Sequence, residues 1–122
     1  MNAKELMIGD WVEFTQPDGQ EFYAQVEALN DDGTFAESGY FADNMVNPIP
    51  LTDEILAKNG FVKNNDHRVL YVHRNAFCGF ALGLDADDYG WHLTDNKFVD
   101  IDNVHDLQHL LRLCGVEKEI VL

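Results

Sequence analysis

The chain has 122 residues, of which 46% are hydrophobic and 11% aromatic, so it is long enough to fold and too rich in aromatic residues to be disordered. Its formal net charge of −14 disfavours direct binding to nucleic-acid phosphates and to anionic membrane surfaces. The composition therefore favours a soluble domain whose partner, if it has one, is a protein.

The negative charge is concentrated in the first part of the chain. Residues 1–50 contain ten Asp or Glu and one basic residue, Lys4, for a net charge of −9, and residues 51–122 carry the remaining −5. Charge of this kind either attracts a basic protein partner or only keeps the protein soluble.

The cysteines and the first residues indicate the compartment. Cys78 and Cys114 lie in apolar stretches, which predicts buried free thiols rather than a disulfide. The opening MNAKELMIGD has no apolar run of the length of a signal peptide. We therefore expect a soluble, cytoplasmic protein.

The first 47 residues predict a small antiparallel β unit. Turn residues at 16–20 and 30–34 separate segments of alternating polarity, and Gly33 can take the positive φ that a tight turn needs. The short strands, the glycine turns and the opening Gly-Asp-Trp-Val resemble a small barrel of the Src-homology (SH3-like) or chromo kind. The expected strands are 9–15, 21–30, 34–38 and 40–46.

Residues 47–62 predict a short helix with clear boundaries. Thr52 can cap its first turn, and Leu51 before the cap can contact Leu56 as a hydrophobic staple. Gly60 follows the last turn, where a left-handed residue ends many helices.

Residues 66–101 predict a second antiparallel meander. In the stretch 77–84, Gly79, Ala81 and Gly83 alternate with larger apolar residues and share one face. A face with so few side chains allows close approach of the final helix, a neighbouring aromatic ring or a ligand. The expected strands are 67–74, 77–84, 89–94 and 98–101.

The last helix is predicted from about Asn103 to Cys114, with Gly115 as its stop, followed by a short strand at 117–122. The intervals of three and four between its apolar residues are typical of a helix that faces the core. That apolar stripe is Val104, Leu107, Leu110, Leu111 and Cys114.

Two histidines, His105 and His109, lie one turn apart on this helix, on the side away from the apolar stripe. Such a pair can hold zinc, but the residue after the first histidine is Asp106 and not the glutamate of a metalloprotease motif. Arg112 continues the same face and would repel a cation. We therefore expect a solvated helix face and no metal.

No other constellation of residues predicts catalysis or a cofactor. Asp85, Asp87 and Gly90 resemble the start of a calcium loop, but Asn96 stands where the last ligand should be a glutamate. We expect an acidic turn there. Cys78 lies in an apolar run, which disfavours a reactive thiolate.

Three stretches, KELMIGDWV (4–12), IPLTDEILAKNGF (49–61) and VHDLQHLLRLCGVEKEI (104–120), closely resemble a family of small uncharacterised proteins from gut anaerobic bacteria and their prophages. The resemblance implies a short helix, a tyrosine-rich β meander, a second helix and a short strand, in that order. The family has no established activity, so the resemblance supplies no functional residues.

The sequence thus predicts a single α+β domain, in which a β unit (1–47) shares its core with a helix, meander, helix and strand unit (48–122). The leading hypothesis is a non-enzymatic accessory protein of a bacterium or prophage. It would bind a protein partner, with a basic protein as one option, through its acidic surface or an exposed β edge. The alternative is an enzyme or small-ligand binder whose pocket uses Tyr71, Gly79, Ala81, Gly83, Trp91 and His92.

Overall fold

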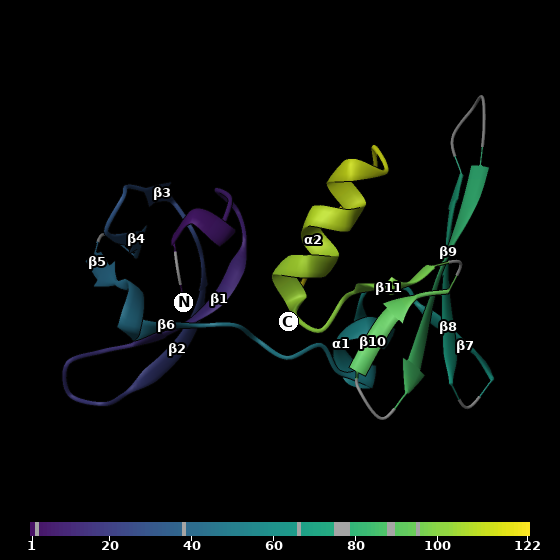
Figure 1. Ribbon diagram of the computed structural model, residues 1–122, viewed down its shortest axis with the longest axis horizontal. Helices are drawn as coiled ribbons and strands as arrows, with labels where there is room; N and C mark the ends of the chain where they lie inside the picture. The colour runs from purple at the N-terminus through teal and green to yellow at the C-terminus, as the bar shows by residue number, and fades with distance from the viewer. Residues whose placement is uncertain (2, 38, 66, 75–78, 88–89, 95) are drawn as a thin grey trace. The chain divides into compact units, whose positions relative to one another are not determined.

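The computed structural model describes every residue except 2, 38, 66, 75–78, 88–89 and 95. It is mixed α+β with antiparallel sheets, which confirms the predicted fold class (Figure 1). The chain divides into two compact units. Unit 1 is Met1–Pro50 with Asn103–His105, and unit 2 is Leu51–Asp102 with Asp106–Leu122. In the described part of the chain, no helix has the length and apolar character needed to cross a lipid bilayer.

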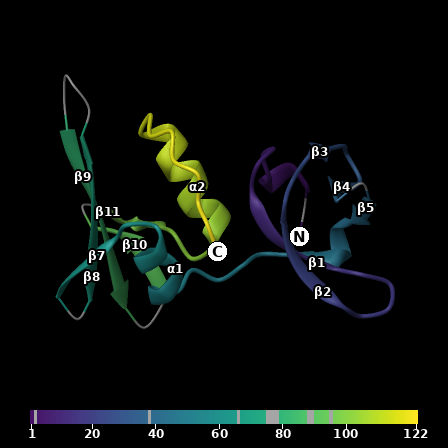
Figure 2. The same ribbon diagram turned by 180° about the vertical axis from the view of Figure 1, so that it is seen from behind.

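Unit 1 contains two small three-stranded sheets. One has the strand order β2-β1-β6 and the other the order β3-β4-β5, and Figure 2 shows both from behind. Two short 3-10 helices, η1 (Ala3–Glu5) and η2 (Asp43–Met45), accompany them. The strands are β1 (Trp11–Thr15), β2 (Glu21–Gln25), β3 (Ala28–Leu29), β4 (Gly33–Ala36), β5 (Gly39–Ala42) and β6 (Val46–Asn47).

The described residues of unit 1 form two small antiparallel sheets and no closed barrel. The resemblance of this unit to a small barrel of the SH3-like kind therefore stays a prediction. The segment predicted as one strand at 21–30 breaks after β2. The Val26 N–H donates to the Asp10 carbonyl at 2.9 Å, and the Glu27 N–H donates to the Phe35 carbonyl at 2.8 Å. The chain therefore leaves the first sheet and enters the second at this point.

The core of unit 1 follows the alternation of β1. Val12 and Phe14 are fully buried, and Val46 of β6 is buried beside them. The Phe14 ring lies 4.7 Å from that of Phe41 and 5.5 Å from that of Phe22, measured between centroids. Such aromatic clusters bury much of the apolar area that stabilises a small domain.

Gly33 is required for a different reason from the one predicted. It is not among the glycines with positive φ. A Cβ at this buried position would lie 2.5 Å from the Phe41 carbonyl oxygen and 2.7 Å from the Tyr40 ring. The turn itself is held by the Asn30 side chain, which accepts hydrogen bonds from the N–H groups of Asp32 and Gly33, both at 2.9 Å.

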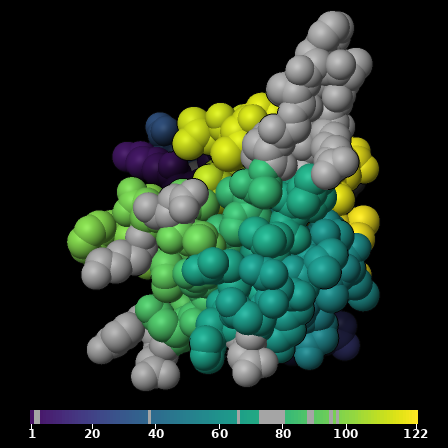
Figure 3. All heavy atoms as spheres, turned by 90° about the vertical axis from the view of Figure 1, so that its right-hand side faces the viewer, coloured from purple at the N-terminus to yellow at the C-terminus, as the bar shows by residue number. Residues whose placement is uncertain are grey.

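Unit 2 is built on a five-stranded antiparallel sheet of order β11-β10-β9-β8-β7. It also contains helix α1 (Asp53–Lys58) and all but the first two residues of helix α2 (Val104–Leu113). Figure 1 places α2 on one side of this sheet, and Figure 3 looks onto the opposite side. The edge strand β7 was not predicted. The strands are β7 (Val62–Asn65), β8 (Arg68–Arg74), β9 (Gly79–Asp87), β10 (Gly90–Leu93) and β11 (Asn96–Asp100).

The predicted boundaries of α1 are confirmed. The Thr52 hydroxyl accepts a hydrogen bond from the Ile55 N–H at 3.2 Å, as an N-cap should. At the other end Gly60 has φ of 86°, and the Phe61 N–H donates to the Leu56 carbonyl at 3.0 Å. This closure ends the helix and leaves Leu56 fully buried.

In helix α2, the predicted apolar face and the predicted end at Gly115 are confirmed, but the predicted solvent exposure of His105 is not. Leu107 and Leu111 are buried, and Gly115 takes the left-handed conformation with φ of 75°. His105 is only 5% exposed, so the prediction that it faces solvent is wrong. The physical reason is that the buried arc of the helix is wider than its apolar stripe, since Gln108 is buried as well.

The predicted burial of Cys114 is also wrong. The helix ends at Leu113 and the chain turns at Gly115, so Cys114 lies beyond the part of the helix that is covered and its thiol is exposed. The other cysteine, Cys78, lies outside the described residues.

No strand forms over 117–122, a segment that the structure describes completely, so that prediction is wrong. The backbone of Val121 instead pairs with a side chain. Its N–H donates to Asn59 Oδ1 at 2.8 Å, and its carbonyl accepts from Asn59 Nδ2 at 2.8 Å. Because this amide satisfies both backbone groups, the segment is fixed without joining the sheet.

Candidate functional site

The residues of the predicted small-ligand pocket do not lie on one face of the sheet in unit 2. Residues directly opposite each other in an antiparallel pair share a face. Val72 lies opposite Ala81, Leu70 opposite Gly83, and His92 opposite Asp85. Ala81, Gly83 and His92 therefore share one face of the sheet, the face away from the buried Leu82 and Leu84.

Tyr71 and Trp91 belong to the other face. Tyr71 lies opposite the buried Leu82, and Trp91 lies opposite Ala86. The Tyr71 ring packs 5.3 Å from the Phe61 ring, with the Lys118 ammonium 5.3 Å from its centroid. Through these contacts Tyr71 packs on the face of the sheet opposite to that of the glycines.

The small-residue face is partly filled by neighbouring side chains. A Cβ added to Gly83 would lie 2.7 Å from the Thr94 hydroxyl and 3.2 Å from Leu70 Cδ2. Gly79 lies opposite Arg74 in the pairing of β8 with β9. No observation brings the six residues into one pocket, and the alternative of a ligand site there stays a prediction.

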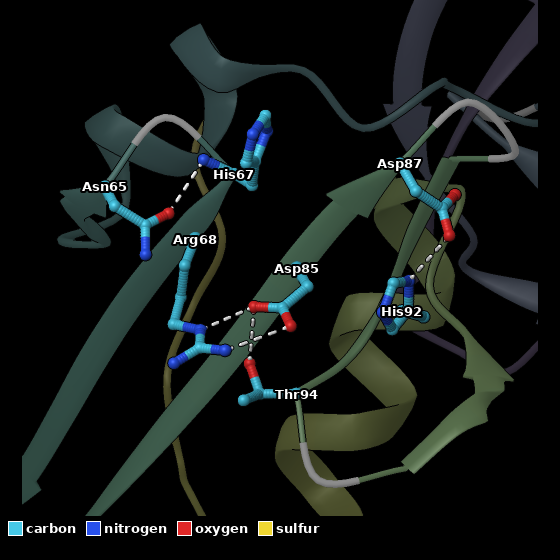
Figure 4. Close-up of polar contacts among 7 residues, drawn as sticks. All are labelled: Asn65, His67, Arg68, Asp85, Asp87, His92 and Thr94. Carbon is cyan, nitrogen blue, oxygen red and sulfur yellow. Dashed lines mark hydrogen bonds and ion pairs between the residues drawn. The ribbon is translucent and has the colours of Figure 1, made fainter.

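A polar cluster on this sheet uses the acids of the predicted acidic turn (Figure 4). Arg68 Nε donates to Asp85 Oδ1 at 2.6 Å, Arg68 Nη2 donates to Asp85 Oδ2 at 3.3 Å, and the Thr94 hydroxyl donates to Asp85 Oδ1 at 3.1 Å. These hydrogen bonds, chiefly the one from Arg68, hold the pKa of Asp85 below its usual range. The cluster therefore links β8 and β9 to Thr94, the residue that follows β10.

The second polar pair on this sheet joins His92 and Asp87. His92 Nδ1 lies 3.6 Å from Asp87 Oδ2 (Figure 4). Within the described ranges, no three His, Cys, Asp or Glu side chains come together as metal ligands.

Asp85 gives the first testable prediction. Its folded pKa is lowered, so its ionised form stabilises the fold above the unfolded pKa of about 3.9, and this contribution is lost as the pH falls through the folded pKa. At pH 7, Asp85→Asn should lower the free energy of unfolding by about 1 kcal/mol, a modest value because Arg68 is 39% exposed.

Urea denaturation of the wild type and of Asp85→Asn between pH 2.5 and 7 checks this. The difference in unfolding free energy should shrink below pH 4. Asp31→Asn, at an exposed position of unit 1, is the control and should change the free energy of unfolding at pH 7 by less than about 0.5 kcal/mol. A difference that stays constant to pH 2.5 would show that the ion pair is not its source.

Unit 1 contains a hollow that the sequence did not predict as a site. It has a volume of about 470 Å³. Its walls come from the segment before β1, from β1 and β2, from the chain just after β2, and from the turn between β4 and β5. The lining residues are Ile8, Gly9, Trp11, Tyr23, Ala24, Gln25, Val26, Glu27 and Glu37.

The alternation of β1 and β2 places two aromatic rings at this hollow. Val12 and Ala24 point into the core, so Trp11 and Tyr23 lie on the opposite face of the same strands. Trp11 is half-buried and Tyr23 is 51% exposed. Aromatic side chains diagonally across an antiparallel pair are within reach of each other.

The hollow also contains carboxylates and no basic group. Glu27 and Glu37 are exposed and form no ion pair with a described residue. The lining residues include no Lys, Arg or His. The walls of the hollow therefore contain aromatic side chains and carboxylates and no basic side chain, a combination that favours a cation.

Glu37 adopts a backbone conformation that its side chain does not favour. Its φ is +50°, and it follows the last residue of β4 directly. Left-handed positions prefer glycine or asparagine, and a bulky residue there costs on the order of 1 kcal/mol. Local stability therefore does not explain why a glutamate stands at this position.

A pair of carboxylates beside Tyr23 adds to the negative potential. Glu13 lies opposite Tyr23 in the pairing of β1 with β2. Burial raises the pKa of Glu13 above its usual range, and Glu21 raises it further by charge repulsion and by a hydrogen bond to it.

Two other hollows belong to unit 2 and carry less information. One of about 600 Å³ is lined by Arg112 and Lys118 as well as Glu117 and Glu119, so both signs of charge meet in it. The other, of about 290 Å³, is lined by Gly60 and by residues of β7 and β8, with Lys63 and Asn64 among them. Of these three hollows in the described part of the chain, that of unit 1 alone is lined by aromatic side chains and carboxylates without a basic residue.

No protein-family model, curated protein or solved structure matches this chain. The resemblance to the family from gut anaerobic bacteria and prophages therefore stays a prediction, and the residues of the hollow carry the functional argument alone.

Proposed function

We propose that this protein is a non-enzymatic interaction protein, which binds a positively charged segment of another protein through the hollow of unit 1. The observation that carries the proposal is the combination of Trp11, Tyr23, Glu27 and Glu37 around one hollow without any basic side chain. The proposal includes an accessory role in the bacterial cytoplasm, for a protein encoded by a bacterium or by its prophage.

Three physical effects favour a cationic occupant. A cation over an aromatic face gains about 0.5–1 kcal/mol at an exposed site and more when it is desolvated. Carboxylates add charge-assisted hydrogen bonds. The net charge of −14 attracts basic proteins over longer distances and raises their association rate at low salt.

The exposed edge of the sheet in unit 2 is a weaker candidate for the binding surface. The edge strand β7 has four exposed residues, and its pairing with β8 shifts register between Lys63 and Asn65. Short length, an exposed lysine and an irregular register are features by which proteins protect a sheet edge from pairing.

The test is the fluorescence anisotropy of a labelled ten-residue peptide in which glycine alternates with Lys and Arg. We expect a dissociation constant of roughly 0.1 mM at low salt, with binding weakened by salt. The double variant Glu27→Gln/Glu37→Asn should weaken binding about tenfold, because it removes both carboxylates of the hollow.

The matched control is Asp31→Asn/Glu54→Gln, which removes the same charge from exposed positions outside the hollow. This control should keep affinity within a factor of about two, since single exposed charges contribute little. Equal losses in the two double variants would show that only net charge attracts the peptide, and no binding by the wild type would reject the proposal.

A further inference from the structure

We propose that the residue held in the hollow is an arginine, with its guanidinium against the rings of Trp11 and Tyr23 and its N–H groups directed to Glu27 and Glu37. This inference rests on the proposed function and specifies the chemistry of the partner. The occupant is thus an arginine side chain in an exposed segment of a partner protein.

The mixed lining favours arginine over lysine. A guanidinium is planar and weakly hydrated, so it can stack on a ring while its edge N–H groups donate to carboxylates in the same plane. A lysine ammonium is compact and strongly hydrated, and it satisfies an aromatic face and two separate carboxylates less well. Tyr23 and Glu27 belong to one stretch of chain and Glu37 to the next hairpin, so the occupant has to contact groups from two segments at once.

The carboxylates also argue against methylated lysine. A trimethylammonium group has no N–H to donate, so Glu27 and Glu37 would lose water on binding without gaining a hydrogen bond. Sites that bind quaternary ammonium groups are usually built from several aromatic rings, which supply binding energy through cation–π contacts. This hollow has two carboxylates in addition to its two rings.

The walls of the hollow are held in place before any ligand binds. The Gln25 side-chain amide donates to the Gly9 carbonyl at 3.0 Å, and the Gly9 N–H donates to the Val26 carbonyl at 2.8 Å. These two bonds tie the segment before β1 to the end of β2 and the residue after it, which are parts of the wall of the hollow. A preorganised site loses less entropy on binding.

Glu37 allows a test that separates binding from folding. Glu37→Asn replaces the glutamate by a residue that tolerates positive φ, so it should keep or raise the thermal midpoint of unfolding. It should also weaken arginine binding about fivefold, the size expected for one charge-assisted contact at a partly exposed site. Asp31→Asn, which removes one charge elsewhere in unit 1, should change affinity by less than a factor of about two.

The experiment is displacement of the labelled peptide by four unlabelled peptides. Their basic positions are all arginine, all lysine, all trimethyl-lysine or all citrulline, which has the shape of arginine without its charge. We expect arginine to compete at least about fivefold better than lysine and trimethyl-lysine, and citrulline to compete little. The arginine preference should fall in Glu37→Asn.

Each outcome decides a different question. If lysine or trimethyl-lysine competes as well as arginine, and the hollow variants still weaken binding, the arginine inference fails and the proposed function stands. If citrulline competes as well as arginine, charge is not recognised and both fail. If Glu37→Asn loses affinity only together with its folded structure, the assignment of Glu37 to the site is overturned.

Discussion

Replacing Asn59 by Ala should lower the free energy of unfolding by about 3 kcal/mol. Asn59 is 1% exposed, and its Nδ2 donates to the Ile55 carbonyl at 2.7 Å. The same amide pairs with both backbone groups of Val121 at 2.8 Å. The variant leaves these groups without partners and frees the C-terminal segment, which packs through the buried Ile120.

Urea denaturation followed by circular dichroism measures this loss. Asn64→Ala on the exposed strand β7 is the matched control and should cost less than about 0.5 kcal/mol. If Asn59→Ala is no more costly than Asn64→Ala, the side chain of Asn59 does not fix the C-terminal segment.

The second large effect concerns Gly33. Gly33→Ala should destabilise unit 1 by about 3 kcal/mol, because the added Cβ would lie 2.5 Å from the Phe41 carbonyl oxygen and backbone must move to accept it. The strand β4 would then separate from β5 at the position where Gly33 pairs with Ala42.

Gly19→Ala separates this clash from the cost of positive φ. Gly19 has φ of +88°, and a Cβ added there would meet no other atom within 4 Å, so its substitution should cost only about 1 kcal/mol. The comparison uses thermal unfolding of both variants. Equal shifts of the midpoint would contradict the close approach at Gly33.

Local features of the chain were predictable where one residue determines one feature. Thr52 and Gly60 mark the ends of α1 because capping needs a hydroxyl and a left-handed residue at fixed positions. Alternation in 77–84 correctly separated the buried Leu82 and Leu84 from the exposed Ala81. These features depend on neighbours in sequence, which periodicity reports directly.

Features that depend on distant residues were not predictable. The break after β2 depends on the Asp10 and Phe35 carbonyls, which meet the chain only in the folded unit. Asn59 replaces the predicted C-terminal strand through contacts 62 residues apart in sequence. The burial of His105 likewise follows from tertiary packing rather than from the apolar stripe of its helix.

The hollow was missed although part of its signal is visible in the sequence. Trp11 alternates with the core residues Val12 and Phe14, as Tyr23 does with Ala24, which already places both rings on the face away from the core. Nothing in the sequence brings Glu37 to the same place, because its position depends on the hairpin of β4 and β5. The acidic character of the first half was recognised, but not which of its acids line one hollow.

The two tryptophans provide the most direct test of the central claim, that unit 1 binds a cationic segment at this hollow. Trp11 lines the hollow and Trp91 lies in unit 2, so their indole N–H signals in a ¹H–¹⁵N spectrum report on the two units separately. Titration with the arginine peptide should shift the Trp11 signal and leave the Trp91 signal in place. A shift of Trp91 alone, or of neither signal at saturating peptide, would contradict the account.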